Sequence, residues 1–99
     1  MESLNYNLKA TFQKSYYGKA IVKDALYPKC ARVYTLQSYE TDVCQIIGSH
    51  GPTQFKRLWD GYSRTTMIHV NEFRWAHGMP ALSKKQWEAL PVEEDIYNR

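Results

Sequence analysis

Hydrophobic and polar residues alternate along much of the first sixty positions, which is the pattern of strands with one buried face. The clearest alternation covers residues 31–38, and shorter stretches of the same kind cover 42–47 and 54–59. Residues 16–23 add a segment rich in strand-forming side chains. The pattern predicts three or four antiparallel strands, the last three of them joined as a meander by short links.

Two segments of this half carry no strand assignment. Residues 24–29 are predicted to be a connection, because Pro28 has no backbone N–H to donate to a neighbouring strand. Residues 1–14 have a mixed pattern that fixes no element.

The spacing of hydrophobic residues changes after residue 62. Amphipathic positions then recur at steps of four, three and four, at Thr66, Val70, Phe73 and His77. Hydroxyl side chains suited to an N-cap precede this stretch and a glycine follows it, so we expect a helix over 64–77. Ser83 followed by Gln86 matches a capping box and predicts a second, shorter helix that stops at Pro91.

Strands followed by helices indicate an α+β fold. We expect a small antiparallel sheet packed by the long C-terminal helix through Val70 and Phe73, with the short second helix beside it. A chain of 99 residues fits a single domain over 1–99, and residues 93–99 are predicted to form a flexible tail.

Composition narrows the class of protein. The chain is 43% hydrophobic and 23% charged, as in a globular protein. No apolar run approaches the ~20 residues of a membrane helix, and the first residues lack the apolar core of a secretory signal. We therefore expect a protein of the cytoplasm with no membrane partner.

The charge distribution is uneven. Twelve basic and six acidic residues fall within 1–87, a net charge of +6, whereas four of the ten acids follow residue 87. A basic body can bind polyanions or acidic protein surfaces, and it argues against a protein that imitates DNA with massed carboxylates.

Metal and catalytic chemistry have little support in the sequence. A zinc site would have to combine Cys30, Cys44 and His50 from separate segments, since no C-x-x-C or H-x-x-x-H spacing is present. We expect reduced thiols and no cofactor, with zinc as the alternative. No nucleophile elbow, phosphate-binding glycine loop or carboxylate pair is present, so we expect no enzymatic activity.

The second half of the chain interleaves basic residues with aromatic rings. Such a set can neutralise phosphates and stack on bases, or form a protein interface, although many of the rings are also needed for packing. The candidate binding residues are Lys56, Arg57, Trp59, Tyr62, Arg64, Arg74 and Lys85.

Five blocks carry a resemblance to a known domain family. They read YYGKA at 16–20, LQSYETDV at 36–43, LWDGYSRTT at 58–66, HVNEF at 69–73 and LSKKQWEALPVE at 82–93. Together they resemble a small uncharacterised domain encoded on phages, plasmids and integrative elements of Firmicutes. The resemblance covers residues 15–93 and departs at 24–30, where this chain has a longer connection. The family has no established catalytic residues to carry over.

The resemblance implies a function by binding. Small proteins of mobile elements commonly block host defence, so we expect a non-enzymatic inhibitor of a host defence complex, of the anti-CRISPR type, with a Cas9 effector as a candidate target. Its partner would be a host defence protein or ribonucleoprotein in the bacterial cytoplasm. The alternatives are a small basic nucleic-acid-binding module and a zinc-stapled interaction domain.

Overall fold

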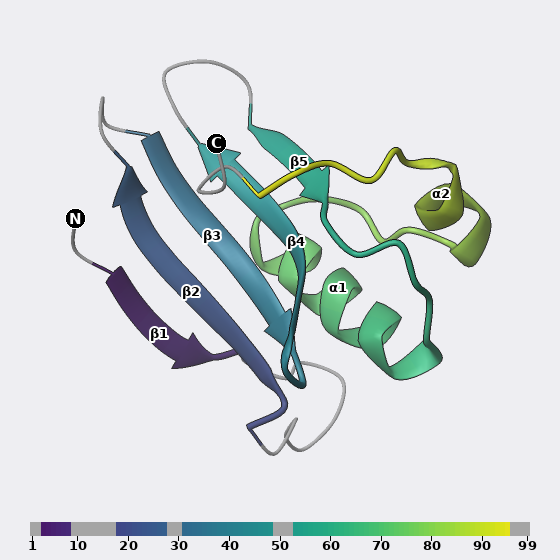
Figure 1. Ribbon diagram of the computed structural model, residues 1–99, viewed down its shortest axis with the longest axis horizontal. Coiled ribbons are helices and arrows are strands. Elements are labelled where there is room, and N and C mark those ends of the chain that lie inside the picture. The colour runs from purple at the N-terminus through teal and green to yellow at the C-terminus, as the bar shows by residue number, and fades with distance from the viewer. Residues whose placement is uncertain (1–2, 9–17, 28–30, 49–52, 96–99) are drawn as a thin grey trace.

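The computed structural model describes residues 3–8, 18–27, 31–48 and 53–95 (Figure 1). The strands pair antiparallel in chain order as one five-stranded sheet. They are β1 (Ser3–Asn7), β2 (Ala20–Tyr27), β3 (Ala31–Ser38), β4 (Thr41–Gly48) and β5 (Gln54–Arg57), and the helices α1 (Arg64–Ala76) and α2 (Lys84–Ala89) follow. The α+β fold is confirmed, with one strand more than the upper number expected.

The meander β3–β4–β5 lies where the alternation placed it. β3 has the expected bounds, and β4 is one residue longer at each end. β5 stops at Arg57, two residues earlier than predicted. The additional strand is β1, whose sequence has no pattern of its own and which is ordered by pairing along β2.

The expected bounds of the first strand were wrong. β2 runs over 20–27, so four residues assigned to a connection belong to a strand, and positions 16 and 17 lie outside the described residues. Asp24 is tolerated there because Arg32 of β3 donates to both of its carboxylate oxygens, each at 3.0 Å. The two residues are diagonal neighbours on adjacent strands, where opposite charges stabilise the pairing.

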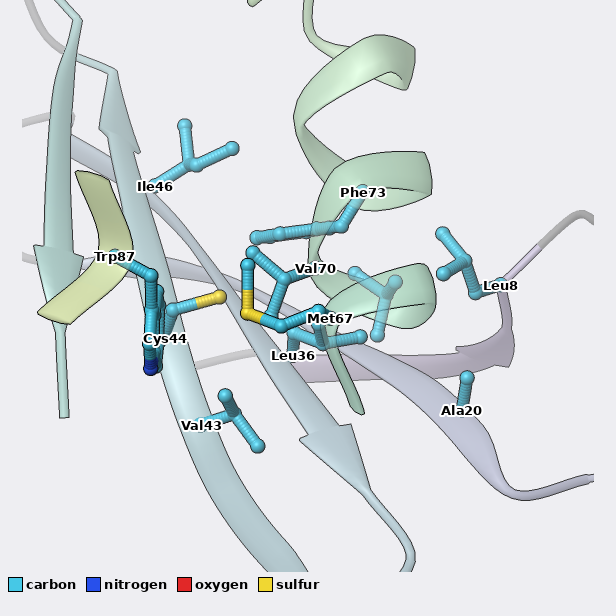
Figure 2. Close-up of a cluster of buried hydrophobic side chains, with 11 residues drawn as sticks. Leu8, Ala20, Leu36, Val43, Cys44, Ile46, Met67, Val70, Phe73 and Trp87 are labelled. Carbon is cyan, nitrogen blue, oxygen red and sulfur yellow. The ribbon is translucent and has the colours of Figure 1, made fainter. Parts of the chain in front are cut away.

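α1 packs against one face of the sheet (Figure 1). Its N-cap is Ser63, whose hydroxyl accepts a hydrogen bond from the Thr66 backbone N–H at 3.0 Å. Val70 and Phe73 are fully buried, as the spacing predicted. Figure 2 shows them pointing toward Leu36 and Cys44 of the sheet.

α2 closes the β5 side of the core. Both hydrogen bonds of the capping box are present, from Gln86 N–H to the Ser83 hydroxyl and from Ser83 N–H to the Gln86 side chain. Trp87 is fully buried and its indole N–H donates to the Gly61 carbonyl at 2.9 Å. Neither helix of the described residues is long and apolar enough to cross a membrane.

The chain after α2 returns to the sheet. Val92 forms a parallel bridge with Arg57, and the Glu93 N–H donates to the Arg57 carbonyl at 2.7 Å. Asp95 accepts a hydrogen bond from Gln45 of β4 at 2.8 Å. Of the tail expected over 93–99, residues 93–95 therefore lie against the sheet, and 96–99 are outside the described part of the chain.

Candidate functional site

The predicted binding residues divide between several places in the fold. Trp59 and Tyr62 line one pocket, and Arg64 opens α1 beside it. Lys56 lies on β5, where its ammonium donates to the Glu94 carbonyl at 3.3 Å. Lys85 is exposed on α2. Trp59, Tyr62 and Arg64 are thus gathered at the start of α1, whereas the other four predicted residues do not line this pocket.

Arg57 is an interior residue, with 6% of its surface exposed. Its guanidinium donates to the backbone carbonyls of Trp59 at 2.8 Å and of Trp87 and Leu90 at 3.0 Å. These bonds connect β5 to the segment after it and to α2. Because its donors are used inside the protein, Arg57 is placed to stabilise the fold.

Arg74 also makes internal contacts. Its guanidinium lies 4.5 Å from the centroid of the Phe55 ring, and its Nε donates to the Pro80 carbonyl at 2.9 Å. Burial lowers the pKa of Arg74 from its ordinary value. The contacts join α1 to β5 and to the loop between the helices.

A pocket of about 230 Å³ lies at the start of α1, between the β3–β4 turn and the segment that follows β5. Two phenol rings, an indole and four hydroxyl side chains surround it. Its lining residues are Ser38, Tyr39, Thr41, Val43, Trp59, Tyr62, Ser63 and Thr66. No ionised side chain is among them, so the pocket is suited to a neutral group that carries hydrogen-bonding atoms.

A polar network lies beneath the pocket. The Ser38 hydroxyl is 2.8 Å from Nδ1 of His69 and 3.2 Å from the Thr66 hydroxyl. Burial lowers the pKa of His69, which favours the neutral imidazole. The network ties the end of β3 to α1 and so fixes the floor of the pocket.

The rim of the pocket is aromatic and basic. Tyr39 and Tyr62 are 47% and 39% exposed. The Lys19 ammonium lies 5.5 Å from the Tyr39 ring centroid, and the Lys84 ammonium lies 4.9 Å from that of Tyr62. Two cations are thereby placed beside the rings that line the pocket.

Tyr39 has a φ of +57°, in the left-handed region that residues other than glycine rarely adopt. Its N–H donates to the Lys19 carbonyl at 2.7 Å, and its carbonyl accepts from the Gln37 side chain at 3.0 Å. Strained backbone of this kind is concentrated at functional sites, where surrounding contacts hold it.

A second surface feature is the outer face of α1, by which we mean Arg64, Ile68 and Trp75. These positions are four and seven residues apart and point away from the buried face. Ile68 is 44% exposed, and Trp75, at 61%, is the most exposed large hydrophobic side chain of the described residues. Neither Ile68 nor Trp75 was among the predicted binding residues. Their helical spacing could have shown that both lie on the side of the helix opposite its buried face.

Few groups of the described residues are suited to catalysis or to metal binding. Ser38 and His69 are hydrogen-bonded, yet only 2% and 3% of their surfaces are exposed. Within the same residues, no group of three or more His, Cys, Asp or Glu side chains is placed to hold a metal. Cys44 is fully buried, and burial raises the pKa of its thiol. Its suggested zinc partners, Cys30 and His50, lie outside the part of the chain that the structure describes.

One family model matches the chain. It covers residues 6–89 and is that of a family of unknown function, DUF8033. The matched stretch contains the whole pocket and the outer face of α1. No curated protein and no solved structure matches the chain.

Proposed function

We propose that this chain, which belongs to the DUF8033 family of unknown function, is a non-enzymatic binding protein that docks on another protein through the outer face of α1. The exposure of Trp75 is the observation that carries the proposal. A folded protein usually leaves its tryptophans largely covered, and Trp is the residue most often found to dominate binding energy at interfaces.

The outer face of α1 has the composition of a small interface. Arg64 stands at one end, the aromatic Trp75 at the other, and the aliphatic Ile68 between them. From residue 64 to residue 75 the helix rises roughly 16 Å at 1.5 Å per residue, which is enough for several contact residues of a helix that binds in a groove.

The charge of the surroundings indicates the chemistry of the partner. Arg64 on this face and the exposed Lys84 and Lys85 of α2 add positive charge. The surface is therefore complementary to an apolar groove with an acidic rim, because opposite charges speed association and select the partner.

We further propose that the partner is a bacterial host defence complex in the cytoplasm and that binding inhibits it, with a guide-loaded Cas9 effector as the first candidate. The sequence blocks that resemble domains of phages and other mobile elements are the support for this role. The basic surface is suited to acidic patches of the effector protein.

The proposal is tested with purified guide-loaded Cas9 effectors from Firmicutes, by measuring binding and DNA cleavage together. We expect at least one effector to be bound and inhibited. Trp75→Ala should weaken binding by about thirtyfold, as for an interface residue worth about 2 kcal/mol. Tyr6→Ala is the matched control, since Tyr6 is an exposed ring on β1, 41% accessible. Equal losses in both variants, or no effector bound, would contradict the proposal.

A further inference from the structure

The pocket beside the start of α1 is separate in its chemistry from the outer face of that helix. We propose that it is a nucleotide site, in which the pocket receives a single base and the basic rim binds the attached phosphate. The proposal goes beyond the protein-docking function, and it shares only Lys84 with the residues argued for docking.

The size of the pocket limits what can enter it. Sites for drug-sized ligands have volumes of about 300–1,000 Å³, and this pocket has about 230 Å³. It therefore accommodates one ring system, and the remainder of the ligand has to lie at the rim.

The lining matches a base in two respects. Rings of Tyr39, Trp59 and Tyr62 line the pocket, and aromatic rings stack on bases whatever the identity of the base. The hydroxyl groups of Thr41 and Ser63 also line the pocket. A hydroxyl both donates and accepts, so these groups can pair with the mixed donors and acceptors of a base edge.

The rim supplies the charge that a phosphate requires. Lys19 and Lys84 lie over the same two tyrosines that line the pocket, and the first turn of α1 contains no acidic residue. The positive end of the helix dipole adds to this field. Glu40 and Asp60 are close in the chain, but neither lines the pocket.

An aromatic side chain of a protein partner is the competing occupant. It would use the rings equally well, but a phenyl ring has no atoms to pair with the hydroxyl groups and no anion to pair with the lysines. The combination of rings, neutral hydroxyls and flanking cations therefore favours a nucleotide.

The test titrates the full chain with adenosine monophosphate, uridine monophosphate and single-stranded hexamers of DNA and RNA. Two-dimensional NMR follows the backbone amides. We expect saturable shifts at residues 38–43 and 59–66. Binding of the monophosphates as tight as that of the hexamers identifies a free-nucleotide site, and tighter binding of the hexamers, with a steep salt dependence, identifies a single-stranded nucleic-acid site.

Matched variants decide whether the pocket is responsible. Tyr62→Ala and Tyr39→Gly should each weaken binding at least tenfold, whereas Tyr6→Ala should change it less than twofold. Tyr39→Gly removes the ring while relieving the strained φ, and its thermal midpoint, measured beside its affinity, should show that the variant remains folded. Lys84→Ala should weaken binding more than Lys85→Ala, because only Lys84 lies over a ring of the pocket.

Three results would overturn the proposal. They are the absence of saturable shifts with every nucleotide, shifts that map away from the pocket, and equal affinities in the tyrosine variants and the control. If an effector protein loses affinity for Tyr62→Ala while nucleotides do not bind, the pocket receives a protein side chain instead.

Discussion

The guanidinium of Arg57 lies 4.7 Å from the centre of the Trp87 ring and donates a hydrogen bond to the carbonyl of the same tryptophan at 3.0 Å. The two residues are thirty positions apart in the chain. This pair joins the last strand of the sheet to α2, and both partners are buried. Arginine is a residue type that often binds phosphate, but the side chain of Arg57 is part of the protein interior.

Arg57→Met should destabilise the fold strongly. The substitution keeps an apolar stem but removes the donors to five backbone carbonyls, two of them at 3.5 Å, and each buried polar group left without a partner costs about 1–3 kcal/mol. We expect the free energy of unfolding in urea to fall by at least about 2 kcal/mol. Lys56→Ala, one position earlier on the same strand, should change it by less than about 0.5 kcal/mol. Similar values for the two variants would contradict the role assigned to Arg57.

Gly61 is required by the position of the Trp59 ring. A Cβ at Gly61 would lie 2.4 Å from Cζ2 of that indole, so Gly61→Ala has to displace the ring or the backbone. Such overpacking costs about 1–3 kcal/mol. Gly48→Ala is the control, because nothing lies within 4 Å of its added Cβ. Thermal denaturation should show a lowered midpoint for the first variant only; an unchanged midpoint would mean that the ring moves freely.

Phe73 should be the most costly truncation on α1. Its side chain is fully buried between the helix and the sheet (Figure 2), and Phe→Ala at such sites costs about 3–5 kcal/mol. Ile68→Ala, on the outer face of the same helix, should cost less than about 0.5 kcal/mol. Urea unfolding with an unchanged slope would measure both, and a loss below about 1 kcal/mol for Phe73→Ala would contradict its place in the core.

Stability should decrease on mild acidification. Burial lowers the pKa values of His69 and His77 below the ordinary 6.5, so the unfolded chain binds protons at a higher pH than the folded chain. The stabilisation is complete above pH 6.5 and is lost as the pH falls through the lowered values. Thermal midpoints between pH 7.5 and 5 should therefore fall.

Replacing the two imidazoles tests their part in this slope. The double variant His69→Gln and His77→Gln should show a weaker dependence on pH over the same range, even where its midpoint at pH 7.5 is lower. A slope equal to that of the natural chain would assign the acid sensitivity to other groups.

The sequence by itself determined the elements whose causes are local. Caps and periodicity depend on residues within a few positions of each other, so Ser63 and the capping box at Ser83 marked both helix starts. The same holds for the buried face of α1 at Val70 and Phe73. It also holds for β3, whose bounds follow from an alternation that is interrupted where the pairing register shifts between Leu36 and Gln37.

Only the tertiary structure decided features that depend on partners far along the chain. β1 has no strand pattern and is ordered by pairing with β2, and Asp24 belongs to a strand because Arg32 lies beside it. Arg57 is buried because carbonyls from another segment surround its guanidinium.

The same reason explains the candidate sites. Tyr39 and Tyr62 line one pocket because the β3–β4 turn lies against the start of α1, and Trp75 is exposed because no described element covers that side of the helix. The sequence specifies which positions carry an aromatic ring, but the burial of each ring depends on which distant segments pack against it.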